Sequence, residues 1–222
     1  MTTAQPTIAA QVAAFSTGAA AQLPPEAVSA FAAEQSGLDA AGLPAGIAAP
    51  GVPMPDGALL DVHGAPTTLT AARHGQPAVV VFYRGAWCPY CNLTLRTYQQ
   101  ELVPALEERG VGLVAISPQR ADGSLSMREA NELTFAVLSD PGNSIAGRLG
   151  ILTAPTDDVR AAQGALGLDL AATNADGTHT LPMPTVAVVD ARGTLRWIDV
   201  HPNYTTRTEV AEILAAVAGL DG

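Results

Sequence analysis

Lysine is absent from this chain of 222 residues, cysteine occurs only twice, and no basic cluster is present. All 11 basic residues are arginines, and 21 acidic residues bring the formal net charge to −10. A chain this acidic is not expected to bind nucleic acid or an anionic membrane surface. No apolar run approaches the roughly 18 residues that span a bilayer. Nucleic-acid-binding and membrane-spanning classes of protein are therefore disfavoured.

The two cysteines and the first residues bear on location. Cys88 and Cys91 are three residues apart, too close to cross-link a domain of this size as secreted proteins do. No basic residue precedes the alanine-rich N-terminal stretch, as one would in a secretory signal. We therefore expect a cytoplasmic protein.

Composition divides the chain into residues 1–50 and residues 51–222. The first part holds two alanine-rich helical patterns, at about 8–21 and 25–35, followed by a segment rich in glycine and proline. Such helices are marginal alone in water. We expect an N-terminal helical extension that packs on the main domain or on a partner, with a disordered leader as the alternative.

The second part alternates between strand and helix patterns. Strands are predicted at 58–62, 67–69, 78–83, 111–117, 135–138, 185–190 and 194–200. Helices are predicted from 92 to Gly110 and at 125–132, 143–149 and 208–218, while 153–181 has only weak helical character. This order predicts an α/β fold with a central mixed sheet flanked by helices.

Cys88-Pro89-Tyr90-Cys91 lies where the strand at 78–83 gives way to a helix. Pro89 suits the first helical position. A helix N-terminus favours a thiolate, and Arg84 adds a positive charge nearby. The spacing puts the two Cα atoms ~5–6 Å apart, within disulfide range. We predict that Cys88 attacks with a lowered pKa and that Cys91 resolves as a thiol.

Other uses of the two thiols are weaker. Structural zinc needs four ligands, and the four histidines supply no second ligand pair of suitable spacing. Inert thiols are the remaining alternative. No flavin or nicotinamide motif is present, so we expect no cofactor and an external source of electrons.

A second signal is Met183-Pro184, directly before the strand at 185–190. One interpretation is a cis bond that turns Pro184 toward the thiols. The other is a proline tolerated at the first residue of a strand. Only about 5–6% of X-Pro bonds are cis, so the cis prediction depends on the cysteine pair.

Together these motifs resemble the thioredoxin fold, and more narrowly the peroxiredoxin-like branch of the alkyl hydroperoxide reductase/thiol-specific antioxidant superfamily. The resemblance is carried by the stretches 82–93, 114–119, 138–143, 181–190 and 201–204. It implies a thiol peroxidase: Cys88 attacks a hydroperoxide, becomes a sulfenic acid, and forms a disulfide with Cys91. The implied reductant is a thioredoxin-like protein or a low-molecular-weight thiol, and homodimer formation stays open.

The same resemblance places substrate around the cysteine turn. Trp87, Pro89, Tyr90 and Pro184 are the expected substrate-binding residues, with core packing as the alternative for the aromatic pair. Asp199, His201 and Tyr204 are expected mostly in a solvated loop.

The chain departs from peroxiredoxins at three positions. Their Pro-x-x-x-Thr-x-x-Cys pattern would place the proline at Val81 and the threonine at Gly85, and their active-site arginine would stand at Pro184. A thiol–disulfide oxidoreductase that uses the same cysteines therefore remains an alternative, as does a redox-sensing module.

Overall fold

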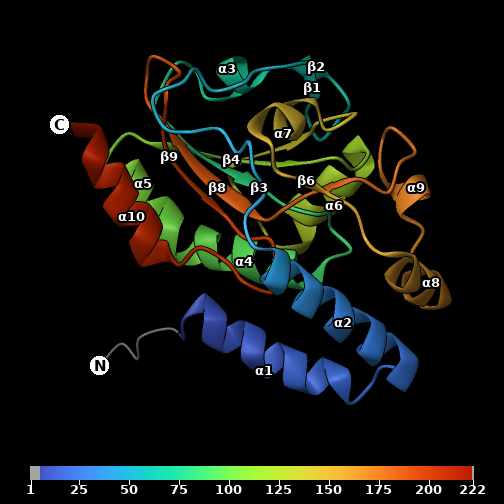
Figure 1. The fold of residues 1–222 in the computed structure, drawn as a ribbon. Coiled ribbons are helices and arrows are strands. Elements are labelled where there is room, and N and C mark those ends of the chain that lie inside the picture. The colour runs from blue at the N-terminus through green and yellow to red at the C-terminus, as the bar shows by residue number, and fades with distance from the viewer. Residues whose placement is uncertain (1–5, 222) are drawn as a thin grey trace.

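The computed structural model describes residues 6–221, which form a seven-stranded mixed sheet with helices on both faces (Figure 1). The strand order is β2-β1-β5-β4-β3-β8-β9. The bounds are β1 Leu59–Leu60, β2 Pro66–Thr67, β3 Ala78–Phe82, β4 Gly112–Ser117, β5 Ala136–Ser139, β8 Thr185–Val189 and β9 Leu195–Val200. This confirms the predicted α/β class, and the predicted hairpin near His63 is present with shorter strands.

Strand β3 is an inner strand of the sheet, between β4, to which it is parallel, and β8, to which it is antiparallel. All five of its residues are buried, because it is covered on both faces. Val79 and Val81 point into one core, and Val80 and Phe82 point into the other. This alternation explains why the strand is a continuous apolar run.

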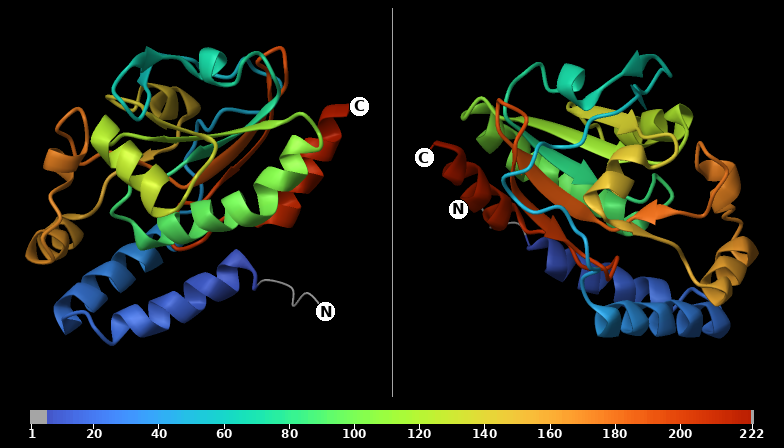
Figure 2. Two further views of the ribbon diagram at one scale, coloured as in Figure 1. Left: turned by 180° about the vertical axis from the view of Figure 1, so that it is seen from behind. Right: turned by 45° about the horizontal axis from the view of Figure 1, so that its top comes forward.

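Five helical segments cover the first face: α4 Pro89–Thr97, a π-helical turn Tyr98–Leu102, α5 Val103–Glu107, α6 Ala121–Ala130 and α10 Val210–Ala218 (Figure 2). The turn interrupts what the sequence predicts as one helix. Pro104 lies at the start of α5, where its missing N–H breaks the regular ladder.

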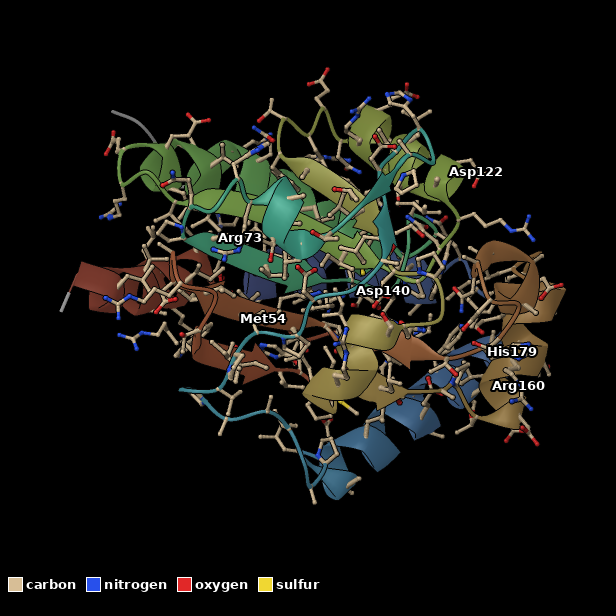
Figure 3. The ribbon with its side chains drawn as sticks, turned by 90° about the horizontal axis from the view of Figure 1, so that it is seen from above. Met54, Arg73, Asp122, Asp140, Arg160 and His179 are labelled. Carbon is tan, nitrogen blue, oxygen red and sulfur yellow. The ribbon has the colours of Figure 1, made fainter. Side chains whose placement is uncertain are left out.

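The second face is covered by α3 Leu69–Ala72, α7 Ser144–Leu149 and the segment around Met54 (Figure 3). The Asp140 carboxylate caps α7, accepting hydrogen bonds from the N–H groups of Ser144 (2.9 Å) and Ile145 (2.8 Å). The stretch 153–181, where the sequence shows only weak helical character, holds two short helices between two short strands that pair with each other. The bounds are β6 Leu152–Thr153, α8 Asp157–Ala165, α9 Leu170–Thr173 and β7 Leu181–Pro182.

The N-terminal residues form two helices, α1 Ile8–Ala20 and α2 Pro25–Ala41, which lie along one side of the sheet domain (Figures 1 and 2). We call α1, α2 and their connection the N-terminal hairpin. It packs on the domain of its own chain: Ile8 and Val12 join the first core, and α2 runs beside α8. Helix α2 is six residues longer than its predicted pattern. No helix in the described part of the chain has the length and apolar character of a membrane span.

Candidate functional site: a buried cysteine pair

The end of β3, the start of β8 and the end of β9 lie together at one end of the sheet, so segments that are distant in sequence meet there. Phe82 at the end of β3 pairs with Thr185 at the start of β8, and Thr185 pairs with Val200 at the end of β9. The chain leaves β3 toward the cysteine turn, and it leaves β9 into the loop 201–209. Pro184, just before β8, meets both, so residues more than 100 positions apart share one site.

The cysteine turn is where the sequence places it. Cys88 is the N-cap of α4, with extended backbone (φ −85°, ψ 112°), and Pro89 takes the first helical position. Cys91 lies one turn inside the helix, and its N–H donates to the Cys88 carbonyl (3.1 Å). Both thiols are free and buried, each about 1% exposed.

The buried Gln119 and the partly buried Asn92 hold this turn in place. Gln119, beyond the end of β4, accepts a hydrogen bond from the Ala86 N–H (2.8 Å) and donates to the Tyr83 hydroxyl (2.9 Å). Asn92 donates to the carbonyls of Ala86 (2.7 Å) and Cys88 (2.9 Å). The approach to Cys88 is therefore fixed from both sides.

Gly85 is a required glycine in this turn. Its φ of +150° favours glycine, and a Cβ there would lie 2.7 Å from Cδ1 of Trp87. The position where peroxiredoxins carry threonine therefore has no room for a side chain unless the Trp87 indole moves.

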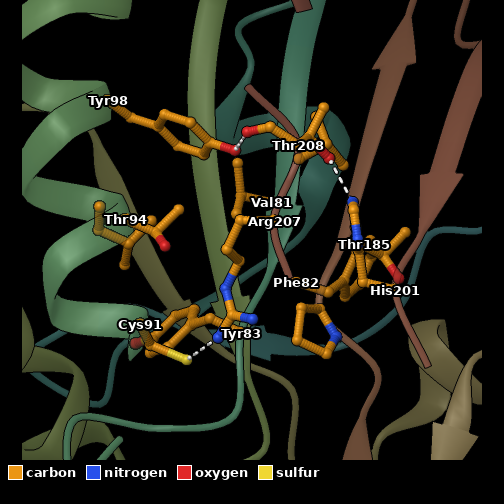
Figure 4. A pocket seen from close by; sticks show the side chains of 13 residues that line it. Val81, Phe82, Tyr83, Cys91, Thr94, Tyr98, Thr185, His201, Arg207 and Thr208 are labelled. Atoms are coloured by element: carbon orange, nitrogen blue, oxygen red, sulfur yellow. Dashed lines mark hydrogen bonds between the residues drawn. The ribbon is translucent and has the colours of Figure 1, made fainter. Parts of the chain in front are cut away.

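Cys91 faces an inner pocket together with Arg207, which lies in the loop after β9 (Figure 4). The Arg207 guanidinium donates a hydrogen bond to Cys91 Sγ at 3.4 Å. The enclosed volume is only about 10 Å³, room for at most one water molecule. His201 lines the same pocket and bonds to the Asp199 carboxylate at 2.9 Å.

These surroundings shift the pKa values of the two thiols in opposite directions. Burial raises the pKa of Cys88 well above its ordinary value, and the hydrogen bond and charge of Cys91 raise it further. Burial also opposes ionisation of Cys91, but the Cys88 hydrogen bond, Arg207 and the Arg84 backbone lower its pKa to about 5. The predicted order, a lowered pKa at Cys88 and a neutral Cys91, is wrong because the hydrogen bond from Cys88 and the charge of Arg207 both favour the thiolate at the inner sulfur.

Cys88 lies instead in a large cavity of about 870 Å³ beneath the N-terminal hairpin, which we call the hairpin cavity. Its walls come from the hairpin, the cysteine turn and the end of α8; the lining includes Trp87, Pro89 and Tyr90. Three of the four predicted substrate-binding residues thus line one cavity with Cys88. Of the two cysteines, only Cys88 lines this cavity.

Arg84 also lines the hairpin cavity and is only 5% exposed. Its guanidinium carbon lies 4.0 Å from the ring centroid of Tyr204 and 5.0 Å from that of Trp87. Within the described residues, Nε of Arg84 and Nε1 of Trp87 have no hydrogen-bond partner. The predicted arginine is therefore beside the thiols, with donor capacity that no protein group uses.

Pro184 corrects a second prediction. The Met183-Pro184 bond is trans, like every other peptide bond between described residues. The backbone runs extended from β7 into β8, where a proline at the strand entry costs no ladder bond. Pro184 lines the inner pocket beside Cys91, away from the hairpin cavity of its three predicted companions.

Sequence reasoning missed Arg207 and misjudged Tyr204. Tyr204 is 7% exposed and stacks on Arg84, where a solvated loop residue was expected. The hairpin of β8 and β9 could have indicated their position, because β9 brings the chain back to the end of the sheet near the cysteines just before Tyr204 and Arg207. Among residues 6–221, no three potential metal ligands gather in one group.

The fold and this buried dithiol define a thioredoxin-like α/β protein. The model of the AhpC/TSA family matches residues 50–198, about two thirds of the chain. The protein therefore belongs to the AhpC/TSA family. No curated protein matches it in sequence.

Solved structures of similar fold include proteins named as peroxiredoxins. Peroxidoxin BcpB from Mycobacterium tuberculosis is 19% identical with a TM-score of 0.58, over 77% of this chain and 97% of its own. Reduced Prx3 from Vibrio vulnificus, solved in complex with H2O2, is 18% identical with a TM-score of 0.60, over 77% and 99%. A peroxiredoxin-like protein from Aquifex aeolicus is 15% identical with a TM-score of 0.60, over 78% and 88%. At these identities the likeness supports the fold.

Proposed function

We propose that the protein is a thiol peroxidase that reduces hydroperoxides with Cys88 and stores the resulting oxidation as a Cys88–Cys91 disulfide. The observation that carries this proposal is the location of Arg84, which lines the hairpin cavity together with Cys88 and has no ion-pair partner among the described residues. Donors placed in advance stabilise the charge that develops when an O–O bond breaks. Membership of the AhpC/TSA family supports the same chemistry.

The first step uses both sulfurs. Cys88 carries the proton and Cys91 the negative charge at neutral pH, and the two share a hydrogen bond. As Cys88 attacks the outer peroxide oxygen, its proton passes to Cys91 and the O–O bond breaks. The departing alkoxide or hydroxide takes that proton from Cys91 and leaves as alcohol or water, so Cys88 is a sulfenic acid and Cys91 is again a thiolate.

The second step closes the disulfide. The Cys91 thiolate, held by Arg207, attacks Cys88 Sγ, and the sulfenic oxygen takes a proton from solvent and leaves as water. The sum is one hydroperoxide and two thiols giving one alcohol, one water and one disulfide. An external thiol then returns two electrons.

Stopped-flow oxidation of the reduced protein tests the proposal. Trp87 is adjacent to Cys88, so its fluorescence is a natural reporter, and peptide mapping identifies the product. We expect rapid oxidation by hydrogen peroxide or an organic hydroperoxide and an intrachain Cys88–Cys91 disulfide, with no reaction in Cys88→Ser. Oxidation no faster than that of a free cysteine would contradict the proposal.

A thiol–disulfide oxidoreductase is the second candidate, and Gly85 favours it. Because the Trp87 indole fills the space of a side chain there, the hydroxyl donor typical of peroxiredoxins is absent. In that case the reduced protein would cleave a model disulfide readily while reacting slowly with peroxides. Measuring both rates on one preparation separates the two functions.

A further inference from the structure

The N-terminal hairpin closes the face from which Cys88 is approached. We propose that the hairpin cavity binds a low-molecular-weight thiol bearing a carboxylate, and that this small thiol rather than a thioredoxin-like protein reduces the Cys88–Cys91 disulfide. The inference rests on the proposed thiol–disulfide cycle and names its reductant.

Cys88 is covered by its own chain. The residues over it include Phe15 and Phe31, one from each helix of the hairpin. A protein reductant must bring its own cysteine, with the surrounding surface, into line with Cys88 Sγ. That surface would overlap α1 and α2, whereas a cavity of about 870 Å³ is in the range of small-molecule sites.

The hairpin is fixed over the turn by several contacts. At the start of α1, the N–H groups of Ile8 and Ala9 donate to the Glu209 carboxylate at 3.0 and 2.8 Å. Further along α1, Phe15 packs edge-on against the Tyr90 ring, with centroids 5.5 Å apart.

Helix α2 is tied to the same edge of the domain. Gln35 donates to the Tyr204 hydroxyl at 3.3 Å, and Glu34 accepts from the Thr156 N–H at 2.8 Å. Tyr204 in turn lies on Arg84. Helix α2 is therefore linked through Tyr204 to Arg84, the charged residue that lines the cavity.

The charge of the cavity is opposite to that of the molecule. The chain carries −10, yet Arg84 is the only charged residue among those that line the cavity. No carboxylate forms an ion pair with Arg84 within the described residues. The remaining lining is alanine, glycine and larger apolar or neutral polar side chains. A small molecule with one carboxylate and a short apolar body matches these walls.

The reduction balances with two such thiols. The first thiolate attacks Cys88 Sγ, the Cys88–Cys91 bond breaks, and Cys91 leaves as a thiolate beside Arg207, 3.4 Å away in the reduced protein. A second thiolate attacks the ligand sulfur of the mixed disulfide. Cys88 then leaves as a thiolate and takes a proton, and the two small thiols leave as their disulfide.

The test begins from disulfide made with diamide, so it does not depend on whether peroxide oxidises the protein. The full-length oxidised chain is reduced with 3-mercaptopropionate, with neutral 2-mercaptoethanol and with a thioredoxin, each rate being divided by the thiolate concentration. We expect 3-mercaptopropionate to react about tenfold faster than 2-mercaptoethanol, as one charge-assisted hydrogen bond allows, and thioredoxin to be slower than both.

Neighbouring alanines on α2 provide a matched pair of variants. Ala32 lines the cavity, and Ala33 is exposed outside it. Both alanines are exposed, but Ala32→Trp adds an indole to the cavity wall and should slow reduction by 3-mercaptopropionate about tenfold or more, while Ala33→Trp should leave it within about twofold; circular dichroism verifies that both fold.

Two results would overturn the inference. One is a thioredoxin that reduces the disulfide faster than either small thiol, in wild type and in both tryptophan variants. The other is equal rates for the charged and neutral thiols. A protein that peroxide fails to oxidise would instead contradict the proposed function and leave these rates measurable.

Discussion

At the scale of single residues, the two sulfurs have different surroundings and therefore different work. Cys88 lines the hairpin cavity and, in the proposed cycle, meets incoming molecules, while Cys91 accepts a hydrogen bond from Arg207 and holds the negative charge. A thiolate of low pKa is a good leaving group in thiol–disulfide exchange. The inner sulfur is therefore suited both to accept the Cys88 proton and to leave when the disulfide is reduced.

Arg207 should set the pKa of the pair. Arg207→Met removes the hydrogen bond and charge at Cys91 Sγ, a loss of roughly 1.5–3 kcal/mol, or about 1–2 pKa units. Ultraviolet absorbance of the thiolate against pH should show a midpoint near 5 in wild type and a higher one in the variant. Arg196→Met, at an exposed arginine, is the control. An unmoved midpoint would show that other groups hold the charge.

Arg84 should matter more for peroxide cleavage than for neutral disulfide exchange. Removing one pre-placed donor typically costs ~10²–10³ in rate. Arg84→Ala should therefore slow hydroperoxide reduction by about that factor, whereas disulfide reduction by neutral dithiothreitol should stay within about tenfold. Stopped-flow measurements on both half-reactions decide, with Arg109→Ala at an exposed position as control. Equal losses in both would mean that Arg84 acts only on the thiols.

At the scale of elements, the predictable parts are those fixed by local pattern. The apolar run of β3 and the proline after Cys88 predict a strand followed by a helix, and both are found. The loop after β9 follows no such pattern. Its place beside Cys91 depends on strand pairing across the sheet, so the contact of Arg207, and with it the pKa order, lies beyond what sequence spacing shows.

The Met183-Pro184 bond is a second feature that local sequence alone does not determine. A proline before a strand fits both a trans entry and a cis turn, and local sequence does not separate them. The path from β7 into β8 decides for trans. The N-terminal hairpin was predicted as helical, but its position over Cys88 results from contacts with Tyr90, Tyr204 and Glu209 that no periodicity encodes.

Glu209 should control the docking of α1. Its carboxylate accepts the N–H groups of Ile8 and Ala9 and also belongs to the capping box of α10 with Glu212. Glu209→Ala should lower the free energy of unfolding by about 1–2 kcal/mol, as loss of a helix cap does, and speed amide exchange in α1. Urea unfolding and hydrogen exchange measure these effects. Glu129→Ala, at an exposed site on α6, should change neither.

At the scale of the whole molecule, the sheet is well buried, whereas the N-terminal hairpin that lies over Cys88 has few buried side chains. Strand β3 is buried throughout, whereas among the described side chains of the hairpin only Ile8, Val12, Ala27 and Glu34 are buried. Segments with few buried contacts open at lower free energy than the core. We therefore expect the access of large molecules to Cys88 to depend on the stability of the hairpin and not on that of the sheet.

Mild denaturant should separate these two stabilities. In urea below the global unfolding transition, the hairpin should undock first, so alkylation of Cys88 by a bulky maleimide should accelerate while circular dichroism of the sheet is unchanged. A small reagent such as iodoacetamide should gain much less, because it already fits the cavity. Mass spectrometry of the labelled peptide distinguishes Cys88 from Cys91. If alkylation by both reagents accelerates only when the sheet unfolds, the hairpin belongs to the same cooperative unit as the sheet and does not open independently over Cys88.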